Sequence, residues 1–165
     1  GRNVAIGPLD EKNYKTIGAA CIAYGQTVIA SSPIDVNLAK QLNILLGNLG
    51  VREQAILMDP TTGGLGYGLE YSYSVVERDR MAALVQEDTK LQFPVICNVA
   101  QEVWKTRETR LTKDEDPRMG DETRRSVLIE SITAMTMLIA GADILILRHP
   151  ESVRLVKEMI SDLMA

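Results

Sequence analysis

Short apolar runs alternate with helical segments five times along this sequence. The apolar runs lie at 3–9, 27–31, 55–58, 93–97 and 142–147, and apolar residues recur at three- or four-residue spacing in the segments that separate or follow them. Strands that are apolar at nearly every position are typical of parallel sheets, because helices cover such strands. The alternation therefore predicts an α/β fold built on one parallel sheet.

Helix signals fit this alternation. Helices are predicted at 10–24, 35–50, 69–85, 121–140 and from 150 onward, with Gly25 and Gly50 as C-terminal caps and Pro150 at a helix start. Within the third helix, the carboxylates of Glu70, Glu77 and Asp79 are predicted to form solvated pairs with neighbouring arginines. The fourth helix is predicted to turn one apolar stripe inward: Leu128, Ile132, Met135 and Ile139.

Two architectures suit five strand–helix units in a chain of 165 residues, which is the length of one domain. One is a five-stranded, flavodoxin-like doubly wound sheet, and the other is part of an eight-unit barrel of about 250 residues. The apolar runs alone do not separate them. Both place the functional edge at the carboxyl ends of the strands, where these side chains gather: Ser31, Ser32, Asp59, Thr61, Thr62, Asn98 and His149.

Composition excludes several classes of function. A formal net charge of −4, with 22 acidic and 18 basic residues mostly interspersed, argues against binding to nucleic acid or to an anionic membrane. No apolar run reaches the ~18 residues of a membrane span. Cys21 and Cys97 lie far apart and His149 is the only histidine, so neither a metal site nor an iron–sulfur cluster is predicted on this chain. We expect a reduced, cytoplasmic protein.

One connection differs in character from the others. Residues 105–120 carry nine charged side chains among 16, and we interpret them as a charged excursion, either solvated or an interaction surface. The first residues, GRNVAIG, lack an initiator methionine, which is expected for a cut or processed chain.

The stretch DPTTGGLGYGLEYSYS (59–74) joins the third apolar run to the third helix. Its glycine spacing matches neither GxGxxG nor GxxxxGK[ST], so it has no nucleotide-binding fingerprint. It is either a flexible turn or a loop whose backbone passes close to a bulky ligand or partner. Asp59 and Thr61 would line the mouth of that loop. No GxSxG and no paired-acid site is present, and no catalytic residue is predicted.

The remaining polar candidates have a structural interpretation beside the functional one. Asn98 can present an amide to a ligand, Cys97 is interpreted as a small buried hydrophobe, and His149 is either a neutral hydrogen-bonding group or a helix cap.

Four segments together resemble a known family: SSPIDVNLAKQLNILL (31–46), MDPTTGGLGYGLEYSYSVVERDRMAAL (58–84), FPVICN (93–98) and GADILILRHPESVRLVKE (141–158). They resemble the small subunit of the corrinoid/iron–sulfur protein, a family that includes the delta subunit of the acetyl-CoA decarbonylase/synthase complex. The similarity runs over nearly the whole chain from NYKTIGAA onward.

The resemblance implies a TIM (β/α)8 barrel, of which this chain would supply the last five units. It implies a non-catalytic small subunit in a heterodimer with a large subunit that carries the iron–sulfur cluster and the corrinoid (cobalamin). That carrier takes a methyl group from a methyltetrahydrofolate (or pterin) methyltransferase to the acetyl-CoA synthase of the CO dehydrogenase complex, in the reductive acetyl-CoA (Wood–Ljungdahl) pathway of carbon fixation. Gly63, Gly64 and the seven polar strand-end side chains would then face the corrinoid or the partner.

Two alternatives stay open. A pterin-binding barrel methyltransferase would use Asp59 and Asn98 to bind its pterin, whereas a flavodoxin-like module would bind a small molecule without a partner.

Overall fold

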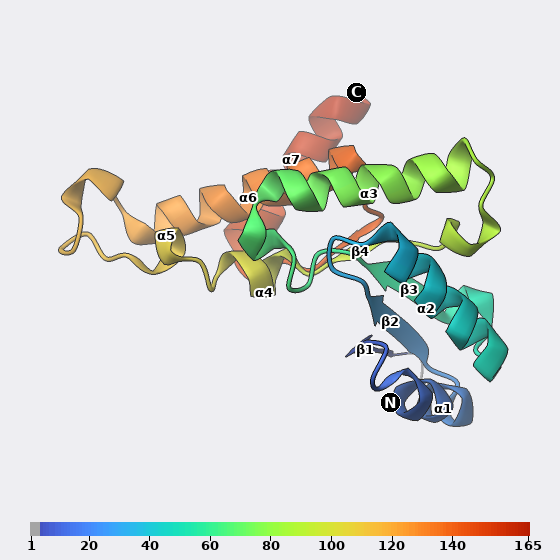
Figure 1. The fold of residues 1–165 in the computed structure, drawn as a ribbon. Coiled ribbons are helices and arrows are strands. Elements are labelled where there is room, and N and C mark those ends of the chain that lie inside the picture. The colour runs from blue at the N-terminus through green and yellow to red at the C-terminus, as the bar shows by residue number, and fades with distance from the viewer. Residues whose placement is uncertain (1–3) are drawn as a thin grey trace.

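Five parallel strands form a three-stranded sheet, β1-β2-β3, and a two-stranded sheet, β4-β5, in the computed structural model, which describes residues 4–165 (Figure 1). Asn3, at the start of the first predicted strand, lies outside the described residues. The strands are β1 (Ala5–Leu9), β2 (Thr27–Ser31), β3 (Ile56–Asp59), β4 (Ile96–Cys97) and β5 (Ile144–Leu145). The prediction of a parallel α/β fold is confirmed, and among residues 4–165 the strands do not close into a barrel.

The strand register is regular from β2 to β3, where Val28 faces Ile56 and Ser31 faces Asp59. One bridge, Met58 to Val95, connects β3 to β4, and the Met58 amide donates to the Pro94 carbonyl at 2.9 Å. β4 and β5 pair at Ile96–Ile144. Both strands are shorter than the predicted runs, but the flanking Val95 and Ile146 still take part in hydrogen bonds between them.

Helices follow the strands near the predicted positions. The main ones are α1 (Tyr14–Tyr24), α2 (Val36–Leu49), α3 (Leu69–Leu84), α6 (Glu122–Ala140) and α7 (Pro150–Met164). Gly25, Gly50 and Gly141 end α1, α2 and α6 in the left-handed conformation that glycine adopts without strain. The first helix begins four residues after the predicted Asp10, because Asp10 and Asn13 form a side-chain-bonded turn there.

The two faces of the sheet differ. Side chains turned toward the helices are fully buried, among them Val28, Met58 and Cys97. On the opposite face, Ile144 and Ile146 are 40% and 38% exposed. The helical layer therefore covers one face, and the core lies between that face and the helices.

The predicted inward stripe of α6 is wrong at three of its four positions. Leu128, Ile132 and Ile139 are 44%, 60% and 67% exposed, and only Met135 is buried. The helix instead buries a face that includes Val127, Glu130, Ser131, Ala134 and Met137. Because apolar residues occur on nearly every side of α6, their spacing could not identify the buried face.

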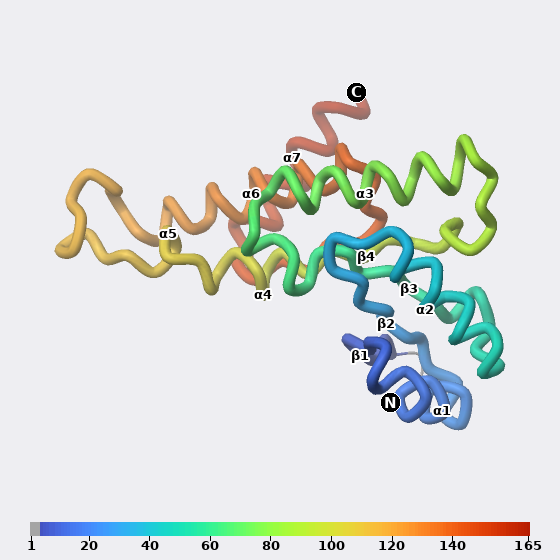
Figure 2. The backbone as a smooth tube through the Cα atoms, viewed as in Figure 1, coloured from blue at the N-terminus to red at the C-terminus, as the bar shows by residue number. Residues whose placement is uncertain are grey.

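The charged segment 105–120 contains two short helices, α5 (Arg107–Arg110) and the 3-10 turn Pro117–Met119, and follows α4 (Val99–Val103). Figure 2 shows this segment extending away from the strands at one end of the molecule. Arg125, at the start of α6, donates to the carbonyls of Glu108, Leu111 and Met119. The guanidinium of Arg125 therefore holds the segment against α6.

Candidate functional site

Asp59 organises the loop that follows β3. Its side chain is 2% exposed, and Oδ1 accepts hydrogen bonds from Thr61 N, Thr61 Oγ1 and Thr62 N at 2.9, 2.7 and 3.0 Å. Oδ2 accepts from the Thr62 hydroxyl. Because an ionised carboxylate has about four acceptor sites, these bonds use most of its capacity. The geometry therefore gives Asp59 a structural role at the strand end.

Thr61 connects this loop to the next strand end. Its hydroxyl donates to Asp59 and accepts from the Asn98 backbone N–H at 3.2 Å. Asn98 in turn caps α4, because its Oδ1 accepts from Gln101 N at 3.2 Å. The loops after β3 and β4 thus form one hydrogen-bonded unit.

The glycines of this loop have different roles. Gly63 has φ +79°, a conformation that favours glycine, and a Cβ there would meet nothing within 4 Å. A Cβ on Gly64 would lie 3.1 Å from Ile34 Cγ1 and 3.2 Å from Pro60 O. The close approach at Gly64 is thus to its own chain, whereas Gly63 and Gly66 leave open space in front of the backbone.

Three of the predicted site residues meet in one hollow of about 160 Å³. Asp59, Thr62 and Asn98 line its rim, and the sheet face opposite the helices forms the rest: Gly7, Pro8, Ile29, Ile96 and Ile146. Pockets that enclose small ligands measure roughly 300–1,000 Å³. This hollow is smaller than that range, and its lining is mostly apolar with a polar rim.

Ser31 and Ser32 lie at the same edge but are buried. Ser31 faces Asp59 in the register of β2 and β3, and Ser32 N donates to the Asp59 carbonyl at 3.0 Å. Ser32 Oγ is buried and has no hydrogen-bond partner among residues 4–165. Neither serine lines the hollow.

His149 lies apart from this group. Its Nδ1 accepts from Glu151 N at 3.1 Å, so it caps α7, and its ring stacks on Trp104 with centroids 6.2 Å apart. It lines a different hollow together with residues of α6 and α7. The capping interpretation therefore holds, and contact of His149 with a partner stays a prediction.

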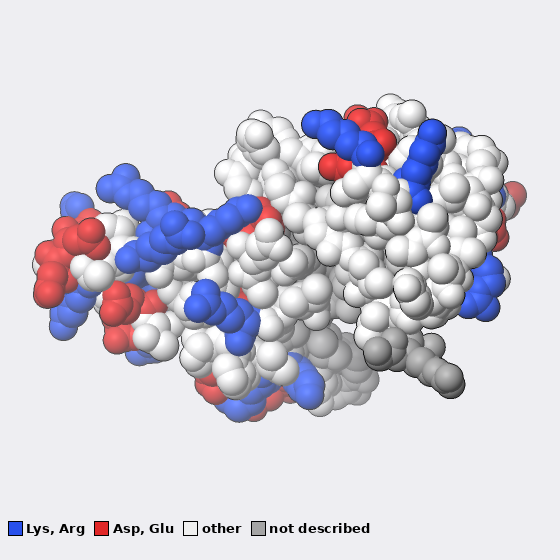
Figure 3. All heavy atoms as spheres, turned by 90° about the horizontal axis from the view of Figure 1, so that it is seen from below, with Lys and Arg blue, Asp and Glu red and all other residues white. Residues whose placement is uncertain are grey.

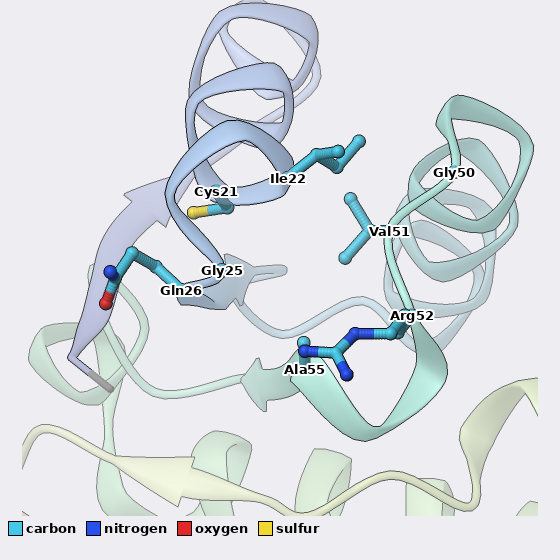
Figure 4. Close-up of a pocket in the computed structure, with 8 residues that line it drawn as sticks. All are labelled: Cys21, Ile22, Gly25, Gln26, Gly50, Val51, Arg52 and Ala55. Carbon is cyan, nitrogen blue, oxygen red and sulfur yellow. The ribbon is translucent and has the colours of Figure 1, made fainter. Parts of the chain in front are cut away.

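A further hollow lies between α1 and the end of α2 (Figure 4). Its volume is about 340 Å³, and Cys21, Gln26 and Arg52 are among its lining residues. These residues precede β2 and β3, so this hollow lies at the amino ends of the strands, and no predicted site residue lines it.

Glu130 is a structural residue that the sequence patterns did not reveal. It is fully buried on α6, and its two oxygens accept from the backbone N–H groups of Arg148 and His149 at 2.7 and 3.1 Å. Glu130 therefore holds the loop after β5. An acidic residue in the middle of an apolar helix was the available signal.

The predicted solvated pairing of Asp79 with neighbouring arginines is wrong. It is fully buried on α3, and neither carboxylate oxygen has a hydrogen-bond partner among the described residues. Burial raises the pKa of Asp79 to about 7, although Arg78 and Arg80 lower it in part. Arg80 itself is engaged elsewhere, with the Gly141 carbonyl at 2.7 Å and with Asp143.

The thiol of Cys97 is fully buried, and burial together with the nearby Asp59 raises its pKa to about 12. A thiol with that pKa stays protonated and is a poor nucleophile at neutral pH. Within residues 4–165, no group of three or more His, Cys, Asp or Glu side chains could hold a metal ion. No helix in this part of the chain is long and apolar enough to cross a membrane.

Comparison with known proteins identifies the family. The model of the CO dehydrogenase/acetyl-CoA synthase delta subunit matches residues 5–162. The chain belongs to this family. The resemblance inferred from the four sequence segments is therefore confirmed.

Curated members of this delta-subunit family cover most of the chain. The acetyl-CoA decarbonylase/synthase complex subunit delta 2 of Methanosarcina acetivorans is 35% identical over 155 residues, 92% of this chain and 35% of its own length. The delta subunit of Methanopyrus kandleri is 36% identical over 159 residues, 96% of this chain and 38% of its own length. That of Methanothermobacter thermautotrophicus is 38% identical over 147 residues, covering 89% and 36%. The chain thus spans about a third of the length of these relatives.

Proposed function

We propose that this chain is part of the small subunit of a corrinoid/iron–sulfur methyl carrier. In this role it would support methyl transfer between a methyltetrahydrofolate (or pterin) methyltransferase and acetyl-CoA synthase, without performing the chemistry. The names of its relatives, subunits of an acetyl-CoA decarbonylase/synthase complex, support this place in acetyl-CoA metabolism. A cytoplasmic location belongs to the same proposal.

The observation that carries the proposal is the hydrogen bonding of the Asp59 carboxylate at the end of β3. Asp59 already accepts four hydrogen bonds from Thr61 and Thr62, so it holds a loop in place and is not poised as a general base. The edge it stabilises combines a rigid hydrogen-bonded unit with open glycine backbone at Gly63 and Gly66. Such an edge suits docking better than proton transfer.

We further propose that the five units belong to a TIM barrel. The strand orders β1-β2-β3 and β4-β5, with the Met58–Val95 bridge between β3 and β4, support this architecture, because neighbouring strands of a barrel are also neighbours in sequence. A flavodoxin-like sheet would place β1 between β2 and β3. The exposed isoleucines on the uncovered face, Ile144 and Ile146, would then line the barrel interior.

A corrinoid fits this edge only as a ligand lying across it. The hollow of about 160 Å³ is too small to enclose a macrocycle, but Gly63 and Gly66 carry no side chain that would obstruct a flat ring. Thr62, Gly63 and Asn98 would make the contacts from this chain. The corrinoid supplies the cobalt that carries the methyl group, and we expect the large partner subunit to hold both it and the iron–sulfur cluster.

Co-purification tests the proposal. The full native protein, mixed with the large corrinoid/iron–sulfur subunit of the same source, should elute as a heterodimer in size-exclusion chromatography. Two separate peaks at micromolar concentrations would refute the carrier role.

A pterin-binding methyltransferase remains the second candidate, because Asp59 and Asn98 do line one hollow. It predicts that the full native protein binds methyltetrahydrofolate and that Asn98→Ala abolishes this binding. The carrier proposal predicts no binding by this protein alone, so calorimetry with methyltetrahydrofolate separates the two.

A further inference from the structure

A second hollow at the same edge of the sheet is lined by cations. Its volume is about 500 Å³, and its basic residues are Lys105, Arg110 and Arg148. No carboxylate lines it; the other lining residues are Asn98, Ala100, Gln101 and Trp104. A hollow whose charged lining residues are all basic is unusual in a chain of net charge −4, whose acidic and basic residues are mostly interspersed.

These cations are only partly neutralised by the protein. Lys105 forms an ion pair with Glu102 at 2.8 Å, and its ammonium has further N–H donors. The Arg148 guanidinium lies 4.7 Å from the centroid of the Trp104 ring. In the described part of the chain, neither Arg110 nor Arg148 forms an ion pair with a carboxylate. Two guanidinium groups therefore remain available to an external anion.

The basic surface continues beyond this hollow. A neighbouring hollow of about 430 Å³ shares Lys105 and Arg110 and adds Arg107 and Glu115. Figure 3 shows many Lys and Arg side chains, together with Asp and Glu side chains, at the end of the molecule where the 105–120 segment lies, next to a largely uncharged surface. The segment interpreted from sequence as a charged excursion thus contributes one wall of a concave, cationic site.

We propose that this hollow binds the phosphate group of a phosphorylated small molecule. Guanidinium groups bind phosphate through paired N–H donors, and the amide of Gln101 can add a neutral donor. An acidic protein or a nucleic acid suits the site less well, because Glu108, Asp114, Glu115 and Asp116 lie on the same segment and would repel an extended anion. The hollow can bind a phosphate whether or not a corrinoid docks at the neighbouring rim.

Titration calorimetry of the full native protein with inorganic pyrophosphate tests this site. We expect saturable binding that weakens with added salt, and Arg110→Gln should raise the Kd about tenfold, as for the loss of one charge-assisted contact. Arg52→Gln, which removes the same charge from the hollow at the amino ends of the strands, should leave the Kd unchanged. Circular dichroism of both variants checks that the fold is intact.

Two corrinoids then identify the source of the phosphate. Cobalamin carries a phosphodiester in its nucleotide loop, and cobinamide lacks it. If Arg110→Gln weakens cobalamin but not cobinamide, the phosphate is that of the corrinoid; if it weakens only pyrophosphate, the ligand is a separate phosphate ester. The proposal is overturned if neither pyrophosphate nor cobalamin binding depends on Arg110, or if Arg52→Gln has the same effect as Arg110→Gln.

Discussion

Two neighbouring helices, α3 and α6, each bury one carboxylate completely, and the two carboxylates have opposite surroundings. Glu130 on α6 accepts two backbone N–H bonds from the loop after β5. Asp79 on α3 accepts none. Burying a charge is costly unless hydrogen bonds compensate, so burial alone does not reveal whether an acidic residue stabilises a fold. The partners decide this.

Removal of Glu130 should have the largest effect. Glu130→Ala leaves the N–H groups of Arg148 and His149 without acceptors, and we expect the free energy of unfolding to fall by about 4 kcal/mol, as for two hydrogen bonds to a charged group. Urea unfolding measures the change. Glu77→Ala, at an exposed position of α3, should alter it by less than about 0.5 kcal/mol. Equal effects of the two variants would contradict the role given to Glu130.

Replacement of Asp79 should have the opposite sign and depend on pH. With its pKa raised from 3.8 to about 7, the folded protein binds more protons than the unfolded chain between these values. Below about pH 4 the Asp79 carboxyl is mostly protonated in the folded and the unfolded protein, so its ionisation does not destabilise the fold. The free energy of unfolding therefore falls as pH rises from 4 to 7. Asp79→Asn should stabilise the protein by roughly 2 to 3 kcal/mol at pH 8 and hardly at all at pH 4, given ~1.4 kcal/mol per pKa unit as the upper limit.

Thermal unfolding of this variant at both pH values measures the difference. Glu77→Gln provides the matched control, because it makes the same change from carboxylate to amide at an exposed position of the same helix. A stabilisation by Asp79→Asn that is equal at pH 4 and pH 8 would show that ionisation is not its cause.

Thr61→Val extends the comparison to a third buried carboxylate, that of Asp59. The substitution keeps the side-chain shape but removes the hydroxyl that joins Asp59 to Asn98 N. We expect a loss of about 1 to 2 kcal/mol, because Asn98 N is left without its acceptor. Thr16→Val, on the exposed side of α1, is the control and should be close to neutral. A neutral Thr61→Val would mean that the two loops are not coupled through this hydroxyl.

The smallest expected effect concerns the glycines of the loop. Gly63→Ala places a side chain at φ +79° and should cost about 1 kcal/mol, although no atom lies within 4 Å of the added Cβ. Gly66→Ala has similar space and no positive φ, so it should be nearly neutral for stability. Differential scanning calorimetry of the pair separates backbone strain from lack of room. If both variants are neutral, the loop relaxes around Gly63.

Sequence patterns predicted much of the fold, because strand and helix periods are local properties. Helix α2 and strand β2 lie within a residue of their predicted bounds, and Asp35 and Gly50 cap α2. The patterns predicted less of the buried surface. On α6 the exposed Leu128 and Ile132 could not be distinguished from buried residues by spacing, since the helix is apolar on several sides.

The candidate site, like the fold, was only partly predictable from the sequence. That Asp59, Thr62 and Asn98 would share one edge followed from their places at strand ends, and the structure brings them to one hollow. That Asp59 is saturated by two threonines, and that His149 caps α7 away from it, depended on side-chain geometry. The cationic hollow was not foreseen, because Lys105 and Arg148 are separated by more than 40 residues of sequence.

The sequence by itself determined the parallel α/β fold, most helix ends and the family, since apolar period, capping residues and similarity to relatives are properties of the sequence alone. Only the tertiary structure decided which buried carboxylates have hydrogen-bond partners. It also decided which arginines form no ion pair with a carboxylate in the described part of the chain. Those outcomes depend on contacts between distant residues, such as Glu130 with Arg148 N, and a hydrogen bond requires its two atoms within about 3 Å.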